Sequence, residues 1–425
     1  MKIRNVFLSF VRLATGEVFG RIATFALFVY VSRYFGVQIL GVVALAQTIA
    51  SYVMELSDQG LKLIGARILA RNAEMASFVV PFVLKRRAAL TAGAVALGAL
   101  YAVIGPVPPE AKMCALAFDF AVVPYAFALD WVAWGLGHFG VLSLWRSGVG
   151  VVYVGLAAAA MQLTMRPIAS IAGANILSAF LGAIFLWVIW KLRWSRSLAQ
   201  QPSDSLLTAA AKELRPTRVV VLGLSNLLNL VFMNADILLL GAMTTTSEVG
   251  RYSAACKPLY VIFTGFWLLT DALYPPLAKL EAGPRAHSVL LLTLAGLATL
   301  ASIAALALGL LAPQILTLIY GSTLGAARLF RILLIALPLD FCFSLLWTVL
   351  VSRGYDRAVL YSLAGAATLN VVLNLVFIPR FQADAAAWAT VASYAVLFSA
   401  VLIFVLRKKV LATAEPDSAI VPVWA

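Results

Sequence analysis

The 425-residue sequence contains little charge and only two histidines. Charged residues make up 12% of the chain, whereas soluble domains carry about 25%. His138 and His287 are far apart, and no HExxH, CxxC, phosphate-cradling GxxxxGK[ST] or nucleophile-elbow GxSxG motif is present. We therefore predict no catalytic residue, no metal site and no cofactor, and we do not expect ATP-driven transport by this chain alone. Catalysis by carboxylates alone is the one enzymatic route that these absences leave open.

Cysteine is also scarce. Cys114, Cys256 and Cys342 lie in apolar stretches and have neither a paired spacing nor the spacing of metal ligands. Such cysteines usually serve as small packing residues. A disulfide framework is therefore not expected.

Long apolar runs are abundant. Hydrophobic residues make up 63% of the chain, and the mean hydropathy is +0.97. A helix needs about 20 apolar residues to cross about 30 Å of hydrocarbon, and lipid forces each spanning segment to pair its backbone internally. The sequence thus predicts an all-α integral membrane protein with about twelve transmembrane helices, at 12–34, 38–57, 88–105, 113–135, 147–165, 168–190, 219–243, 252–274, 288–311, 330–352, 358–378 and 385–406.

The basic residues predict an orientation. The formal net charge is +14, but the basic residues cluster between apolar runs, which favours a role in orienting helices over nucleic-acid binding. Loops on the side of the N-terminus hold 22 Lys and Arg residues, and the opposite loops hold 7. Because basic loops stay inside, both termini are expected in the cytoplasm.

The largest polar interruption lies near the middle of the chain. Residues 191–218 separate two sets of six predicted spans, an arrangement typical of a duplicated transporter. We therefore predict an N-terminal six-helix bundle over 1–205. A C-terminal six-helix bundle over 206–425 would end in a short cytoplasmic tail.

A few charged residues interrupt the spans. A charge at the bilayer centre costs about 2.5–3.5 kcal/mol on insertion scales, so a retained charge usually faces a cavity or a partner. Glu17 and Arg21 are four residues apart on the first span and therefore share a face. They can form an internal ion pair, line a cavity, or do both. Lys257 precedes Pro258, which bends a helix and frees a carbonyl, although the lysine can also simply extend to the membrane surface.

Amides and carboxylates form the remaining candidates. Asn226, Asn229 and Asp236 share one face of the seventh span, where they can contact substrate or bond to a neighbouring helix. Asn370 and Asn374 favour helix–helix hydrogen bonding. Candidate carriers of a coupling proton or sodium ion, in addition to Asp119, are Asp271, Asp340 and Asp130.

Several motifs together resemble a known family. The stretch Asn234-Ala-Asp236 to Gly241, followed by Val249-Gly250-Arg251-Tyr252, resembles the start of the second half of polysaccharide flippases. These are the O-antigen and exopolysaccharide exporters of the multidrug/oligosaccharidyl-lipid/polysaccharide superfamily. The similarity runs from about residue 10 to 405 and includes segments beginning at Ser32, Asp58, Ile319, Asn370 and Ala385. One departure is Gln382-Ala-Asp384, where the family commonly has a Gly-x-x-Gly-Ala-Ala turn.

The resemblance implies a fold and a cargo. The fold would be two six-helix bundles around a central cavity, and the cargo a polyprenyl diphosphate-linked glycan flipped across a bacterial inner membrane. Arg21 and Lys257 would then bind the diphosphate, with Glu17 orienting Arg21, while Asn229 and Asp236 contact sugar or gate the cavity. Membrane lipids, a polysaccharide polymerase and glycosyltransferases would be partners.

Three other functions fit the same sequence. A cation-coupled drug or small-molecule exporter of the same superfamily would favour acidic cavity residues, and both signs occur here. A membrane glycan polymerase or ligase would usually carry a large external loop, and no external loop is longer than about 20 residues by the span assignment. A scaffold without transport activity is the third alternative.

Overall fold

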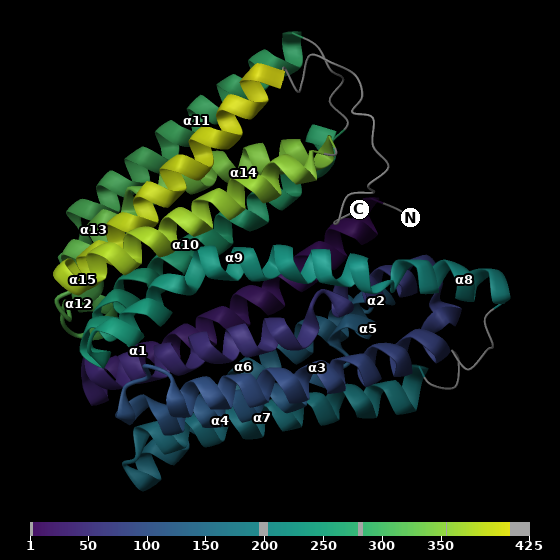
Figure 1. The fold of residues 1–425 in the computed structure, drawn as a ribbon, viewed down its shortest axis with the longest axis horizontal. Coiled ribbons are helices and arrows are strands. Elements are labelled where there is room, and N and C mark those ends of the chain that lie inside the picture. The colour runs from purple at the N-terminus through teal and green to yellow at the C-terminus, as the bar shows by residue number, and fades with distance from the viewer. Residues whose placement is uncertain (1–2, 195–202, 279–283, 354, 409–425) are drawn as a thin grey trace. The chain divides into compact units, whose positions relative to one another are not determined.

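The computed structural model describes residues 3–194, 203–278, 284–353 and 355–408. All regular secondary structure in these ranges is helical, and no strand occurs in them (Figure 1). The chain divides into two compact units, residues 1–230 and 231–425, which are described separately here. The all-helical prediction is confirmed, and the predicted bundle limits of 1–205 and 206–425 stay a prediction.

The first unit begins with α1 and extends into α9. Its helices are α1 (Ile3–Asp58), α2 (Leu61–Arg71), α3 (Ala76–Ile104), α4 (Pro109–Ala126), α5 (Asp130–Gly135), α6 (Phe139–Thr164), α7 (Pro167–Ile189), α8 (Asp204–Glu213) and α9 (Pro216–Met243). Figure 1 shows α3, α4, α7 and α6 running alongside one another. Glycines let two of these helices approach closely, because Gly20 of α1 packs directly on Gly150 of α6.

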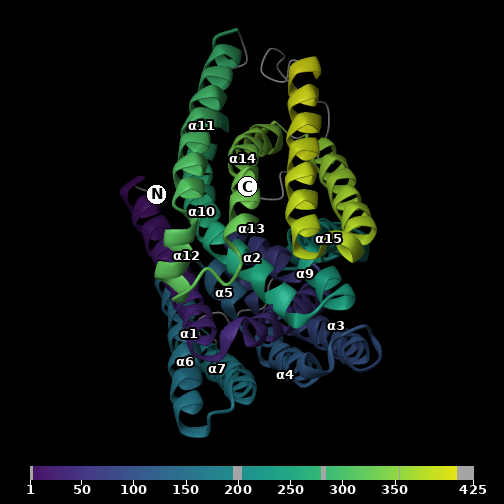
Figure 2. The same cartoon turned by 90° about the vertical axis from the view of Figure 1, so that its left-hand side faces the viewer.

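The second unit continues from α9. It holds α10 (Thr246–Ala278), α11 (Pro284–Leu310), α12 (Ala312–Tyr320), α13 (Ala327–Leu334), α14 (Ala336–Ser352) and α15 (Asp356–Lys408). Figure 2 shows α14 between α11 and α15, and α14 packs on both. Aromatic rings of Phe263, Phe341 and Tyr394 meet in the interior of this unit.

Two long helices each contain a pair of predicted spans. In α1 the spans 12–34 and 38–57 meet at Gly36, which has φ 83°. In α15 the spans 358–378 and 385–406 meet at Gln382, which has φ 51°. A single non-helical residue therefore joins the two spans in each pair.

The predicted span at 113–135 is not one helix. Helix α4 ends at Ala126, and α5 begins at Asp130. Pro124 has no N–H to donate to the preceding turn, which weakens the helix there. The Phe127 carbonyl beyond this end accepts a hydrogen bond from the Trp187 indole Nε1 at 3.0 Å. A side chain from α7 thus satisfies a backbone group that a continuous helix would have paired.

Eight stretches within the described ranges are long and apolar enough to cross a membrane. Two of them lie within α1 and α15, and each of these helices joins two of the predicted spans. The chain is therefore a multi-pass membrane protein by length and composition, and the count of twelve crossings stays a prediction.

Candidate functional site

A buried polar cluster of the second unit surrounds Asp236. This carboxylate lies on α9 and is 4% exposed. Tyr252 of α10 donates its hydroxyl hydrogen to Asp236. The Thr390 hydroxyl of α15 lies 3.1 Å from the Tyr252 oxygen and 3.5 Å from Asp236 Oδ2. Three helices are therefore joined through one buried carboxylate, an arrangement that rigidifies their packing when every member is paired.

A second buried carboxylate lies in the same unit. Asp340 of α14 is 2% exposed and is hydrogen-bonded to Tyr394 of α15. The Tyr394 hydroxyl also lies 3.7 Å from the sulfur of Met233, which is on α9. A cavity of about 20 Å³ between Tyr252 and Tyr394 separates the two groups of side chains and is large enough for one water molecule.

The two predicted diphosphate ligands belong to different units. Arg21 is exposed on α1, and Lys257 is half-buried on α10 directly after the buried Cys256. Both side chains are therefore at least partly accessible at the surface of their own unit. Their convergence on one ligand stays a prediction.

The other predicted substrate contacts differ in burial. Asn229 is exposed on α9, whereas Asp236 is buried and bonded to Tyr252. The neighbouring amide Asn226 is hydrogen-bonded to Glu55 of α1. The side chains of Glu17 and Asp271 lie outside the described residues.

The asparagine pair of α15 is self-contained. Asn370 and Asn374 are 1% and 0% exposed. Asn374 Nδ2 donates to the Asn370 side-chain oxygen at 2.9 Å and to the Asn370 carbonyl at 2.9 Å. These bonds lie within one helix, whereas the sequence favoured bonds between helices.

Two ion pairs meet at the end of the first unit that is predicted to face the cytoplasm. The Arg87 guanidinium lies 3.1 Å from Asp58 and is 1% exposed. Lys62 lies 3.1 Å from Asp130. Asp130, a predicted carrier of a coupling ion, therefore has a lysine partner from the start of α2. Asp58, Lys62, Arg87 and Asp130 thus lie together at this end of the first unit.

The polar connector packs on the same end of the first unit. Arg71 of α2 pairs with Glu213 of α8 at 3.5 Å, and Arg86 donates to the Leu214 carbonyl at 3.3 Å. The rings of His138 and Trp194 stack with centroids 4.8 Å apart. Partial burial, and to a lesser degree the charge of Arg193, lower the pKa of His138, which favours the neutral imidazole.

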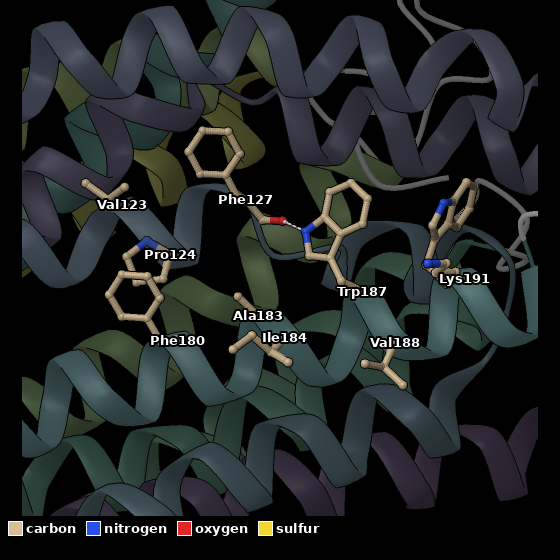
Figure 3. A pocket seen from close by; sticks show the side chains of 10 residues that line it. Val123, Pro124, Phe127, Phe180, Ala183, Ile184, Trp187, Val188 and Lys191 are labelled. Carbon is tan, nitrogen blue, oxygen red and sulfur yellow. Dashed lines mark hydrogen bonds between the residues drawn. The ribbon is translucent and has the colours of Figure 1, made fainter.

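An apolar groove of about 570 Å³ follows the outer sides of α4 and α7. Figure 3 shows Phe127 and Phe180 at its walls, and Lys191 lies at one end. The Trp187 indole closes part of the groove through its bond to the Phe127 carbonyl. The lining suits a hydrocarbon chain, as expected for a surface that faces lipid.

The comparisons with known proteins identify the fold. The sequence matches no protein-family model and no curated protein. The structure, however, resembles the lipid II flippase MurJ in an inward closed conformation, with a TM-score of 0.73 and 13% identity over 94% of this chain and 89% of that one. The chain has the fold of MOP-superfamily transporters.

Two drug-transporter structures support the same conclusion. An inward-facing multidrug resistance MATE transporter of the MOP superfamily gives a TM-score of 0.63 at 17% identity, covering 96% of this chain and 100% of that one. A point mutant of the Vibrio cholerae MATE transporter VcmN gives 0.59 at 15% identity, covering 95% and 98%. The resemblance to the superfamily is thus confirmed at the level of fold, and both flippases and drug exporters share it.

Proposed function

We propose that this protein flips a polyprenyl diphosphate-linked oligosaccharide from the cytoplasmic to the periplasmic leaflet, by alternating access, for the synthesis of a surface polysaccharide. The observation that carries the proposal is the pair of cations retained in apolar spans, Arg21 in one unit and Lys257 in the other. The fold shared with a lipid II flippase supports it.

The cargo explains why cations would be kept there. A diphosphate head carries negative charge that must leave water during flipping, and guanidinium and ammonium groups bind phosphate oxygens through charge-assisted hydrogen bonds. The hydrocarbon tail can stay in lipid throughout. A site for such a cargo therefore needs basic groups inside the membrane and has no need of a large apolar pocket.

The remaining features of the proposal follow from the same orientation. The protein would lie in the inner membrane with both termini in the cytoplasm. Asn229 would contact sugar, and Asp236 would hold the helices around it. A polymerase and glycosyltransferases would act on the same glycan before and after flipping.

Cation-coupled export of a drug or small molecule is the second candidate. It is favoured by the buried carboxylates Asp236 and Asp340, because acidic groups bind cationic substrates and coupling ions. It is also supported by the likeness to MATE transporters.

The purified protein, reconstituted in vesicles, would distinguish the two candidates. We expect wild-type protein to move a fluorescent polyprenyl diphosphate oligosaccharide between leaflets, and we expect the Arg21→Ala and Lys257→Ala variants each to lose most of this activity. The exposed Arg166 is a matched control, since Arg166→Ala removes one positive charge outside the spans.

The outcomes separate clearly. Undiminished flipping by the double variant Arg21→Ala/Lys257→Ala, at normal protein levels, would refute the diphosphate site. Transport of a cationic dye by vesicles that leave the labelled glycolipid unmoved would establish the exporter instead. In cells, a deletion strain should accumulate the lipid-linked glycan whose sugars identify the cargo.

A further inference from the structure

A buried carboxylate without a partner lies between α3 and α4 of the first unit. Asp119 is 1% exposed, and neither of its carboxylate oxygens has a hydrogen-bond partner among the described residues. Gly98 of α3 lies directly against it, because a Cβ at position 98 would come within 2.6 Å of Asp119 Oδ2. The glycine therefore gives the carboxyl group the room that it occupies.

Two buried polar side chains, Arg87 and Thr91, lie on the face of α3 that also carries Gly98. Arg87, Thr91 and Gly98 are separated by four and seven residues and so share one face of α3. The Arg87 Nη1 and the Thr91 hydroxyl are buried and lack hydrogen-bond partners within the part of the chain that the structure describes. Arg87 pairs with Asp58 at one end of this face, Gly98 lies against Asp119 at the other, and the apolar Ala94 lies between Thr91 and Gly98.

Gly98 and the Asp119 carboxyl group beside it lie deep in the predicted membrane. Eleven residues separate Arg87 from Gly98, which is roughly 16 Å along a helix. The hydrocarbon layer is about 30 Å thick, so with Arg87 at the predicted cytoplasmic surface Asp119 would lie near its middle. A carboxyl group at this depth is costly and rarely kept without a function.

The surroundings of Asp119 are apolar. A cluster of Val53 from α1, Ala94 from α3 and Val122 from α4 packs beside it. Helices α1, α3 and α7 pack on α4. Among the described side chains, α1 carries the charged residues Arg21, Arg33, Glu55 and Asp58 and several tyrosines. Helix α3 carries Lys85, Arg86, Arg87 and Tyr101, and α7 carries no titratable or charged side chain. No hydrogen bond or ion pair links any of them to Asp119.

These surroundings determine the chemical form of the carboxyl group. An ionised carboxylate without a cation or a donor would carry a desolvation cost far larger than that of the neutral acid. A sodium ion would need several oxygen ligands, and the described residues contain no group of three acidic, histidine or cysteine side chains that could hold a metal. A proton neutralises Asp119 without any further ligand, so these surroundings favour the protonated acid.

We propose that Asp119 is a proton-binding site of the first unit, which holds its proton while buried against Gly98 and releases it to water when α3 and α4 move apart. The step breaks the O–H bond of the acid, transfers the proton to water and leaves the carboxylate, so no other reagent is required. Thr91 and Arg87 mark the side of α3 from which water and protons would reach it.

The inference deepens the proposed function, because proton release would couple transport to a proton gradient. Its first test needs no cargo. Infrared difference spectra of the purified protein, recorded as the pH is raised from neutral, should show loss of the carbonyl stretch of a protonated aspartic acid. Isotope labelling of aspartate assigns the band, and Asp119→Asn should remove it.

The control is Asp384→Asn, which makes the same chemical change at a carboxylate that pairs with the exposed Arg328. This variant should keep the band. Because asparagine resembles the neutral acid in shape and charge, Asp119→Asn should also fold at least as stably as the wild type. A band that survives Asp119→Asn, the absence of a protonated-aspartate band in the wild type, or a variant that does not fold would each overturn the proposal.

The second test uses transport. In vesicles with an imposed pH gradient, flipping by the wild type should respond to the gradient, and flipping by Asp119→Asn should lose that response. If wild-type vesicles do not move the glycolipid, the proposed cargo is wrong, while the infrared result still decides whether Asp119 binds a proton. A gradient response that persists in Asp119→Asn would exclude the coupling role.

Discussion

Gln382 adopts a backbone conformation that glycine adopts more easily. Gln382 joins the two parts of α15 and has φ 51° and ψ −131°. A side chain at such a position costs about 1–3 kcal/mol, and a glycine there avoids the clash at some entropic cost. We expect Gln382→Gly to raise the free energy of unfolding by about 1 kcal/mol.

Thermal unfolding of the purified protein measures this change. Gln382→Ala is the control, because alanine keeps the Cβ and should give no comparable gain in Tm. A fall in Tm for Gln382→Gly would mean that contacts of the glutamine side chain outweigh the strain.

At the residue level, the sequence indicated which groups would be unusual but not their partners. Asp236 was recognisable as a carboxylate in an apolar span. Its partners Tyr252 and Thr390 are 16 and 154 residues away, and only the folded chain brings them together. The pairing of Lys62 with Asp130 was likewise hidden, since 68 residues separate them.

Among the helices, the contact between α2 and α5 depends on two glycines. A Cβ at Gly65 would lie 2.5 Å from the ring of Trp131, and a Cβ at Gly135 would lie 2.6 Å from the Ala66 carbonyl oxygen. Trp131 is 1% exposed, so its ring has little room to move. We expect Gly65→Ala to destabilise the protein by roughly 1–3 kcal/mol, as overpacking of a filled core does.

Gly93 offers a matched comparison in α3. A Cβ at position 93 would meet nothing within 4 Å. Gly93→Ala should therefore leave Tm unchanged or raise it slightly, because alanine favours the helix. Equal Tm values for the two alanine variants would show that Trp131 can rearrange without cost.

Helix boundaries were less predictable than the helices themselves. Apolar length placed helical structure on every predicted span because hydrophobicity is a local property of the sequence, although 113–135 is divided between α4 and α5 and 330–352 between α13 and α14. It did not place the break between α4 and α5, since that break is completed by Trp187, which lies 60 residues beyond the carbonyl it binds. Likewise, hydropathy could not distinguish the single-residue turn at Gln382 from an ordinary loop.

For the whole molecule, the predicted orientation can be tested with engineered cysteines. All three native cysteines are buried, so the wild type should react poorly with a membrane-impermeant maleimide. Leu163 is 84% exposed and lies at the end of α6, and Leu192 is 74% exposed and lies just beyond the end of α7. These two positions are predicted to face opposite sides of the membrane. In spheroplasts, we expect Leu163→Cys to be labelled and Leu192→Cys to be protected.

Inside-out vesicles should give the reverse pattern. Labelling of Leu192→Cys from the outer side, with Leu163→Cys protected, would invert the topology. The direction of flipping in the proposed function would then need revision.

Composition was sufficient to predict a membrane protein, because so little polar surface cannot cover a soluble globule, and the length of the apolar runs predicted that it is helical. The motifs added the superfamily fold, which the structural likeness to MurJ and MATE transporters confirms. The cargo could not be predicted in the same way, since flippases and drug exporters share this fold.

The single-residue turns at Gly36 and Gln382 have a consequence outside the membrane. Proteases cleave extended backbone that can enter their active-site cleft, and exposed loop tips are their usual targets. At these two turns, helix continues on both sides of one residue, so neither offers such a segment. A cell shaved with protease should therefore retain both helical pairs intact, even where its longer surface loops are cut.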